Sequence, residues 1–236
     1  MRKKIWIIAL CAVLALTLAG IAVWYFGYYR PEKKADEAML QAFREYYEAK
    51  VTEYEKENQA YDDFQVDVAF LGDSLTDGYD LNKYYPQYLT ANRGIGGDTT
   101  YGLEERLQVS VYDLQPKVAV MLIGANNMDT MFDNYEAILI GLKSNLPDTQ
   151  IVLLSLTSMG GEWGRKNQLA AENNVQIKAL AEKYGLTFVD LYTPLMNEAT
   201  GEIVPEYTTD GGHLTAEGYE VVTAQITPVL ETLLNK

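Results

Sequence analysis

The chain has 236 residues, enough for one sizeable α/β domain with an added segment. Its formal net charge is −14, so no basic stripe is available to neutralise phosphates, and nucleic acid is not an expected partner. The single cysteine, Cys11, rules out a disulfide framework, and the single histidine, His213, rules out a metal centre built from several histidines.

Residues 1–30 are expected to anchor the chain in the cell membrane. Three basic residues, 2–4, precede an uncharged apolar stretch from residue 5 to about residue 26, which is long enough to span a bilayer as a helix. Aromatic residues crowd its far end, and the basic start favours an N-terminus inside the cell. We therefore expect a single-pass protein whose remaining chain is extracytoplasmic. A signal peptide cleaved after Ala19 is the alternative, but the apolar run continues past that point.

Residues 31–64 have the composition of a long connecting helix, with no glycine or proline after Pro31. Apolar and aromatic residues recur there at steps of three and four, which makes one stripe on a helix. The members of this stripe are Met39, Leu40, Phe43, Tyr46, Tyr47, Val51, Tyr54 and Tyr61. The stripe could dimerise the protein as a coiled coil or pack on the catalytic domain. Its irregular aromatic character favours packing, and the oligomeric state stays open.

Apolar runs and helix-like segments alternate regularly from residue 65 to residue 236. The apolar runs are residues 66–71, about 88–95, 118–123, 151–156 and 186–191, and the helix-like segments are 103–114, 135–144, 168–184 and 216–234. Such alternation predicts a parallel sheet with helices on both faces. The loops that follow the strands should meet at one edge of that sheet, where ligands bind in open α/β folds.

Acyl transfer needs a nucleophile, a base, a group that orients the base, and donors for the oxyanion. Ser74 follows the first strand directly, where a nucleophile is expected. His213 is the sole imidazole and so the natural general base near neutral pH. Asp210 lies three residues earlier and can hold one ring nitrogen while the other faces Ser74. The glycines of the loop 92–100 and the side-chain amide of Asn126 offer N–H donors.

These stretches resemble the signature blocks of the GDSL-type esterases and lipases, also called SGNH hydrolases. The blocks are Gly-Asp-Ser-Leu at 72–75, residues 92–100 with Gly97, Gly-Ala-Asn-Asn at 124–127, and Asp-Gly-Gly-His at 210–213. The resemblance covers residue 65 to the C-terminus. It implies a three-layer α/β/α sandwich of flavodoxin-like type with a five-stranded parallel sheet, and neither a cofactor nor a metal.

The resemblance also assigns roles to residues. It implies Ser74 as the nucleophile, with Asp210 and His213 completing the triad. The backbone N–H groups of Ser74 and Gly97 and the side chain of Asn126 would form the oxyanion hole. The chain departs from the family at Asn127, because the third block usually reads Gly-x-Asn-Asp.

We therefore expect a membrane-anchored, extracytoplasmic serine esterase that cleaves short acyl groups from carbohydrate. A lysophospholipase, thioesterase or acyltransferase would use the same triad, and a non-catalytic binding protein is the alternative of another class. Asp73 and Trp163 are the candidate substrate-binding residues. Trp163 lies in the loop after the fourth strand and offers a flat surface for a sugar ring, whereas no long apolar insertion is available to form a tunnel for a long acyl chain.

Overall fold

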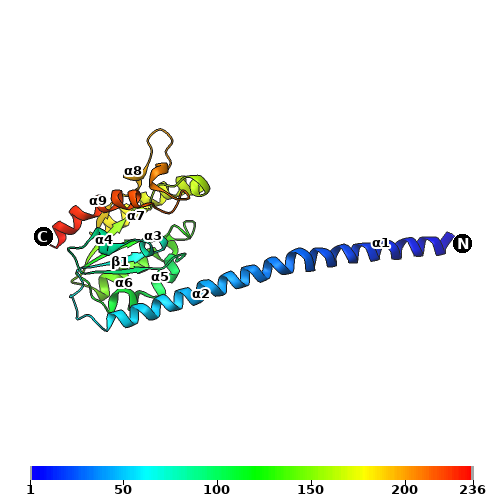
Figure 1. Cartoon of the computed structure of the whole chain (residues 1–236), viewed down its shortest axis with the longest axis horizontal. Helices are drawn as coiled ribbons and strands as arrows, with labels where there is room; N and C mark the ends of the chain where they lie inside the picture. The colour runs from blue at the N-terminus through cyan, green and yellow to red at the C-terminus, as the bar shows by residue number, and fades with distance from the viewer. Residues whose placement is uncertain (1, 235–236) are drawn as a thin grey trace. The chain divides into compact units, whose positions relative to one another are not determined.

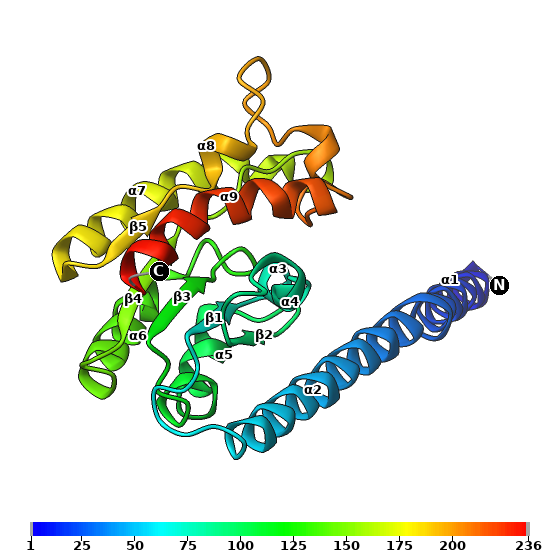
Figure 2. The ribbon, with the colours of Figure 1, turned by 60° about the vertical axis from the view of Figure 1, so that its left-hand side comes forward.

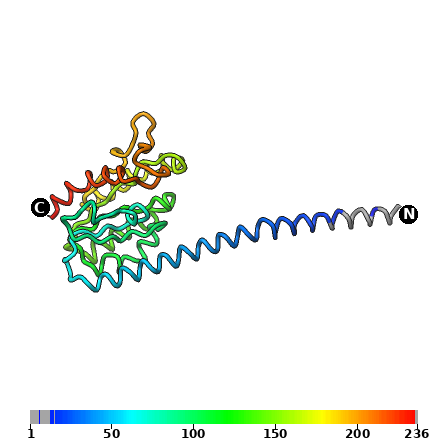
Figure 3. Tube along the Cα trace, viewed as in Figure 1, coloured from blue at the N-terminus to red at the C-terminus, as the bar shows by residue number. Residues whose placement is uncertain are grey.

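A computed structural model describes the backbone of residues 2–234 and the side chains of residues 6, 13–14 and 16–234 (Figure 3). The chain divides into two compact units, residues 1–49 and residues 50–236. The first unit is helical throughout its described part. The second unit holds the sheet and all four of the motif-bearing loops.

The first unit consists of α1 (Arg2–Trp24), a π-helical turn (Tyr25–Tyr29) and the part of α2 (Arg30–Asn58) that precedes Lys50. Among the described residues, no helix combines the length and the apolar character needed to cross a membrane. The structure therefore does not support the transmembrane helix expected over residues 5–26. The side chains of residues 5, 7–12 and 15, within that stretch, lie outside the described ones.

The second unit is built on a five-stranded, fully parallel sheet, as the sequence predicts. Its strands are β1 (Val68–Gly72), β2 (Thr90–Gly94), β3 (Val118–Leu122), β4 (Gln150–Leu154) and β5 (Thr187–Val189), in the spatial order β2-β1-β3-β4-β5. Val68 is in register with Thr90 on one side and with Val118 on the other. Every residue of β1 and β3 is buried, which explains their continuous apolar runs.

Helices flank this sheet (Figures 1 and 2). They are α3 (Ser74–Asp77), α4 (Leu81–Tyr84), α5 (Thr100–Glu105), α6 (Phe132–Asn145), α7 (Asn167–Tyr184), α8 (Tyr192–Leu195) and α9 (Ala216–Leu233). Between them lie a π-helical turn (Gln108–Tyr112) and two 3₁₀ turns (Gly161–Lys166 and Pro205–Tyr207). The helices expected near 135–144, 168–184 and 216–234 are confirmed.

The helix expected over residues 103–114 was wrong as a single element. It starts earlier, at Thr100, and ends at Glu105, and a π-helical turn follows from Gln108. The interruption falls at Arg106, whose buried guanidinium bonds to Asp98, to Ser110 and to two backbone carbonyls. A buried arginine must satisfy its donors, and the change from α-helix to π-helical turn coincides with this side chain.

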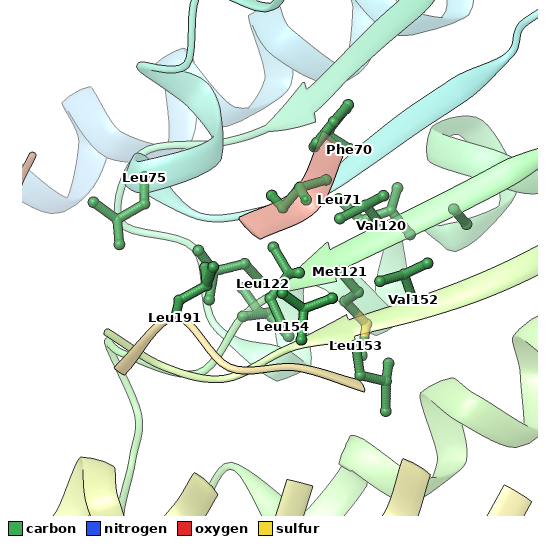
Figure 4. Packing of buried hydrophobic residues seen from close by; sticks show 14 of the residues in the cluster. Phe70, Leu71, Leu75, Val120, Met121, Leu122, Val152, Leu153, Leu154 and Leu191 are labelled. Carbon is green, nitrogen blue, oxygen red and sulfur yellow. The ribbon is translucent and has the colours of Figure 1, made fainter. Parts of the chain in front are cut away.

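Apolar side chains from the three central strands form the core beneath the carboxyl edge of the sheet (Figure 4). Leu71, Val120 and Leu153 are all buried to 1 % exposure or less. Burying a side chain of this size contributes about 1.5–3 kcal/mol, so the strand ends are held rigidly. The strand order reverses between β1 and β3, and the loops that leave these two strands carry Ser74 and Asn126. This reversal is where open α/β sheets place their ligands.

Candidate active site

The sharp turn after β1 brings Ser74 to the carboxyl edge of the sheet. Gly72 ends β1, and a Cβ atom there would lie 2.2 Å from Thr76 Oγ1 and 2.3 Å from the carbonyl oxygen of Leu122. Only glycine therefore lets α3 fold back so tightly on β1 and β3. Asp73 caps α3 by accepting the N–H of Leu75. The turn leaves Ser74 half-buried at the start of α3, between two buried neighbours.

Ser74, His213 and Asp210 form a continuous chain of hydrogen bonds. Ser74 Oγ lies 3.1 Å from His213 Nε2, and His213 Nδ1 lies 2.6 Å from Asp210 Oδ2. The other carboxylate oxygen of Asp210 accepts the backbone N–H groups of His213 at 2.7 Å and Gly212 at 2.9 Å. The structure thus brings together the three residues of the expected triad, which lie up to 139 positions apart.

Asp210 is held in its charged form. Desolvation is the largest single influence on its pKa and acts to raise it. The backbone N–H of His213, the imidazole of His213 and the N–H of Gly212 act in the opposite direction, and together they lower the pKa of Asp210 to about 2. Asp210 is therefore an anion at every pH at which a histidine could act as a base, and it can orient the ring and stabilise its protonated form.

The glycine loop after β2 carries the expected oxyanion donor Gly97. Gly97 is exposed and adopts a φ of 80°, a conformation that favours glycine. Its neighbour Asp98 is buried and joined to Arg106 at 2.8 Å. The backbone carbonyl of Asp98 accepts a hydrogen bond of 2.8 Å from Asn126 Nδ2. An amide nitrogen carries two hydrogens, so Asn126 can hold this loop with one and donate the other to an oxyanion.

Asn127, the departure from the family pattern, belongs to a directional hydrogen-bond chain. Its Nδ2 donates to Thr100 Oγ1 at 2.9 Å, and its Oδ1 accepts the N–H of Thr100 at 3.2 Å. The Thr100 hydroxyl donates to Asn134 Oδ1 at 2.7 Å, and the Asn134 amide donates to Glu104. The chain ties the loop after β3 to α5 and α6. It uses a donor that an ionised aspartate at position 127 would lack.

Asp73 does not lie where a substrate-binding residue would. Its side chain is 1 % exposed, and Oδ2 is a buried atom for which the described residues provide no hydrogen-bond partner. Burial is the main cause that raises the pKa of Asp73 to about 7, against the lowering effect of the Leu75 N–H. Asp98 raises it further, and His213 lowers it. We assign Asp73 to capping α3 rather than to substrate contact.

Trp163 lies beside the triad, in the 3₁₀ turn Gly161–Lys166. Its ring meets the His213 ring edge-on, with centroids 5.9 Å apart and planes at 89°. It also packs on Gly212, where a Cβ would approach the indole to 2.7 Å. Lys166 Nζ lies 4.8 Å from the indole centroid and 3.4 Å from the carbonyl oxygen of Ala125. The loop after β4 therefore borders the site, as expected, and the indole is half-buried.

Two residues of the site were missed from the sequence. Lys166 places a cation between Trp163 and the loop that contains Asn126. Arg106 supports the glycine loop through its bonds to Asp98 and to the carbonyl oxygen of Arg93. For Arg106 no clear signal existed, because helical periodicity does not show that a charged residue will be buried. Nothing near Lys166 in the sequence distinguishes it from a solvated lysine.

Comparison with known proteins places the chain in a family. Residues 70–221 match the GDSL-like Lipase/Acylhydrolase family. No curated protein sequence matches the chain. A GDSL-like lipase from Bacteroides thetaiotaomicron is similar, with 27 % identity, coverage of 77 % of this chain and 97 % of that one, and a TM-score of 0.69.

Two further structures share the fold. One, from Streptococcus pneumonia and provisionally described as a platelet activating factor, has 25 % identity, coverage of 84 % and 99 %, and a TM-score of 0.70. An acetylxylan esterase from Geobacillus stearothermophilus has 22 % identity, coverage of 71 % and 95 %, and a TM-score of 0.58. At 22 % identity, the similarity to this esterase concerns the fold alone.

Proposed function

The chain belongs to the GDSL-like lipase/acylhydrolase family and is a serine ester hydrolase, and on this premise we propose that Ser74 cleaves short-chain carboxylic esters through an acyl-enzyme. The observation that carries this proposal is the unbroken link from Ser74 Oγ through His213 to Asp210. A binding protein that used only the fold would have no need of this arrangement.

In the first half-reaction, Ser74 Oγ attacks the carbonyl carbon of the ester while its proton passes to His213 Nε2. The resulting tetrahedral intermediate carries a negative oxygen, which the N–H groups of Ser74 and Gly97 and the amide of Asn126 stabilise. The intermediate collapses by breaking the bond to the alcohol oxygen, and His213 returns the proton to that oxygen.

In the second half-reaction, water takes the place of the alcohol. His213 accepts a proton from water, whose oxygen attacks the acyl carbon, and the bond to Ser74 Oγ then breaks with return of the proton to the serine. The carboxylic acid leaves. Throughout, Asp210 keeps the imidazole in the orientation that presents Nε2 to Ser74.

Ser74→Ala in the full chain tests this proposal. Hydrolysis of p-nitrophenyl acetate should fall by about 10⁴-fold or more, while the thermal midpoint should hardly change because Ser74 is not part of the core. Ser144→Ala, at an exposed serine of α6, is the matched control and should keep full activity. Retention of wild-type activity in Ser74→Ala would overturn the proposal.

For the substrate, we propose an acetyl or similarly short acyl group on a carbohydrate. Three observations support this. The indole of Trp163 borders the triad, the surrounding loops are rich in glycine and polar groups, and an acetylxylan esterase is among the structural neighbours. A long alkyl chain left outside such a site would forgo about 0.8 kcal/mol for each unburied CH₂.

A series of nitrophenyl esters tests the length of the acyl group. The specificity constant kcat/KM should fall from acetate and butyrate toward octanoate. Trp163→Ala should reduce the cleavage of acetylated xylan more than that of p-nitrophenyl acetate. A clear preference for long-chain esters would instead favour a lysophospholipase, and faster turnover of acyl-thioesters or transfer to added sugars would favour a thioesterase or an acyltransferase.

We also propose that the catalytic unit works outside the cytoplasm, held at the cell membrane by residues 1–30. The basic residues at positions 2–4 and the uncharged stretch that follows them support this. Protease added to intact cells, after removal of any outer barrier, should degrade the catalytic unit. Protection until the cells are lysed would place that unit inside.

A further inference from the structure

The end of α2, residues 50–58, belongs to the same compact unit as the sheet, although it precedes the part of the chain that matches the family. Its side chains contact β2, including its last residue Gly94, and they contact Asp77, which accepts an N–H of the glycine loop, residues 94–98. That loop contains Gly97, to which the proposed function gives an oxyanion donor. The contacts between this helix end and the loop are therefore a feature of this chain that the family motif does not describe.

Tyr54 fixes the start of the glycine loop. Its ring is 2 % exposed, and its hydroxyl donates a hydrogen bond of 2.5 Å to the carbonyl oxygen of Gly94. Gly94 is the last residue of β2, and a Cβ there would lie 2.2 Å from the backbone nitrogen of Asp77. The backbone at Gly94 is thus clamped between α2 and the helix that Ser74 begins.

Lys50 acts on the middle of the loop through Asp77. Lys50 Nζ lies 3.1 Å from Asp77 Oδ1, and Asp77 Oδ2 accepts the N–H of Gly96 at 3.2 Å. Both charged side chains are partly shielded, with 26 % and 19 % exposure, so the pair is screened less than a surface ion pair. The carboxylate that orients the amide beside Gly97 is itself held in place by the lysine of α2.

A buried arginine fixes the helix end to the sheet. Arg93 of β2 is fully buried, with its guanidinium 2.6 Å from Glu57 Oε2 and 3.0 Å from Asn58 Oδ1. It also lies 4.6 Å from the centroid of the Tyr54 ring. A buried guanidinium is costly unless its donors find partners, and the two Nη groups of Arg93 find theirs in Glu57 and Asn58, although Nε has no partner among the described residues. Arg93 therefore favours one placement of residues 50–58. Tyr54 and Lys50 therefore meet Gly94 and Asp77 in a defined register.

We propose that Lys50 and Tyr54 are positioning residues that preorganise the glycine loop for the oxyanion. An oxyanion donor contributes fully only if it is already in place when charge develops. A glycine-rich loop loses more conformational freedom on ordering than other segments, so it needs external ties. This inference rests on the proposed function, because it acts through the donor at Gly97.

Two variants of the full chain, Lys50→Met and Tyr54→Phe, test the inference. Each should lower kcat for p-nitrophenyl acetate by about tenfold, less than the loss of a whole donor, and leave KM within about twofold. Lys56→Met, at an exposed lysine of the same helix, is the matched control and should leave both unchanged. Lys50→Arg should restore most of the kcat lost in Lys50→Met.

A second readout separates positioning from a structural role. Benzeneboronic acid forms a bond between boron and Ser74 Oγ, and the displaced proton passes to His213, so the adduct mimics the tetrahedral intermediate. Its Kd should rise in both variants in proportion to the loss of kcat. The thermal midpoint of each variant should stay above the assay temperature, so that the variant is folded during the measurement. Unchanged kcat, or a loss of kcat without weaker boronate binding, would overturn the inference. If Ser74→Ala is inactive while both variants are fully active, the inference fails and the proposed function stands.

Discussion

The carboxyl group of Asp73 is buried directly beside Ser74, and this burial destabilises its charged form. A carboxylate that loses its hydration without a full set of partners is destabilised, and this raises the pKa of Asp73 to about 7. The neighbouring carboxylate of Asp98 adds to the effect. The folded protein therefore binds a proton at Asp73 that the unfolded chain releases near pH 4. The stability of the fold should fall as the pH rises between these two values.

Asp73→Asn should abolish this dependence. The amide keeps an oxygen to cap α3 but carries no charge, so the variant should gain stability relative to the wild type above pH 7 and little at pH 4. The difference between the folded and unfolded pKa values of Asp73 corresponds to about 4 kcal/mol in the free energy of unfolding, which is the upper bound on the gain above pH 7. Urea unfolding at pH 4, 6 and 8 measures it. An equal difference at all three pH values would contradict the assignment.

Asn127→Asp should destabilise the protein even though it restores the usual residue of the family. An ionised aspartate cannot donate to Thr100 Oγ1. Either the Thr100 hydroxyl turns to donate to the aspartate, or a carboxylate oxygen faces the oxygen of Thr100 without a hydrogen between them. In the first case Asn134 Oδ1 loses its donor. The free energy of unfolding should fall by about 1–3 kcal/mol, measured by urea unfolding at pH 7. Asn145→Asp, at an exposed amide of α6, is the control, and an equal or smaller effect at Asn127 would refute the reasoning.

At the level of elements, α3 and α9 must be held together because Ser74 begins one and His213 precedes the other. Tyr219 of α9 joins them, since its hydroxyl donates to the carbonyl oxygen of Leu75 at 2.9 Å. Its ring stacks on Tyr79, with centroids 4.8 Å apart. The Tyr79 hydroxyl in turn bonds to Thr223, one turn further along α9. This cluster joins α9 to the segment after β1, and through these elements it links Ser74 to His213.

Tyr219→Phe should therefore lower both stability and kcat. The ring stacking remains, but the Leu75 carbonyl loses its partner, which costs about 1–3 kcal/mol. Esterase kinetics and urea unfolding of the same preparation measure the two effects. Tyr184→Phe is the control, because it removes a tyrosine hydrogen bond to Glu136 that has no contact with the triad. It should affect stability alone. A Tyr219→Phe variant with unchanged kcat would show that the cluster does not position the triad.

The short elements were the least predictable from sequence. The α3 and α4 helices have four residues each, too few for an apolar period to appear. The helix around Arg106 was predicted as continuous because periodicity does not reveal that a charged residue will be buried. The long helices α6, α7 and α9 were predictable, since each repeats its apolar positions over several turns.

At the level of the whole molecule, the catalytic edge was predictable because parallel strands place their carboxyl ends together. Ser74 and Asn126 each follow a predicted strand, so the fold brings them to the same edge. Asp210 and His213 precede the last helix, and their place at this edge was expected from the resemblance to the family. The contribution of residues 50–58 was not predictable in this way. The stripe containing Tyr54 indicates which face of α2 is apolar but not which strand it meets. Its partner Arg93 resembles a surface residue until the structure shows it buried.

The central claim is that Ser74 forms the covalent acyl-enzyme, and trapping by a fluorophosphonate tests it most directly. Ser74 Oγ should displace fluoride from phosphorus, with its proton passing to His213. Mass spectrometry should then find one adduct for each chain, on the peptide that contains Ser74. The adduct should be absent from Ser74→Ala and form far more slowly in His213→Ala. Modification of another residue, or an equal rate of labelling in His213→Ala, would contradict the account.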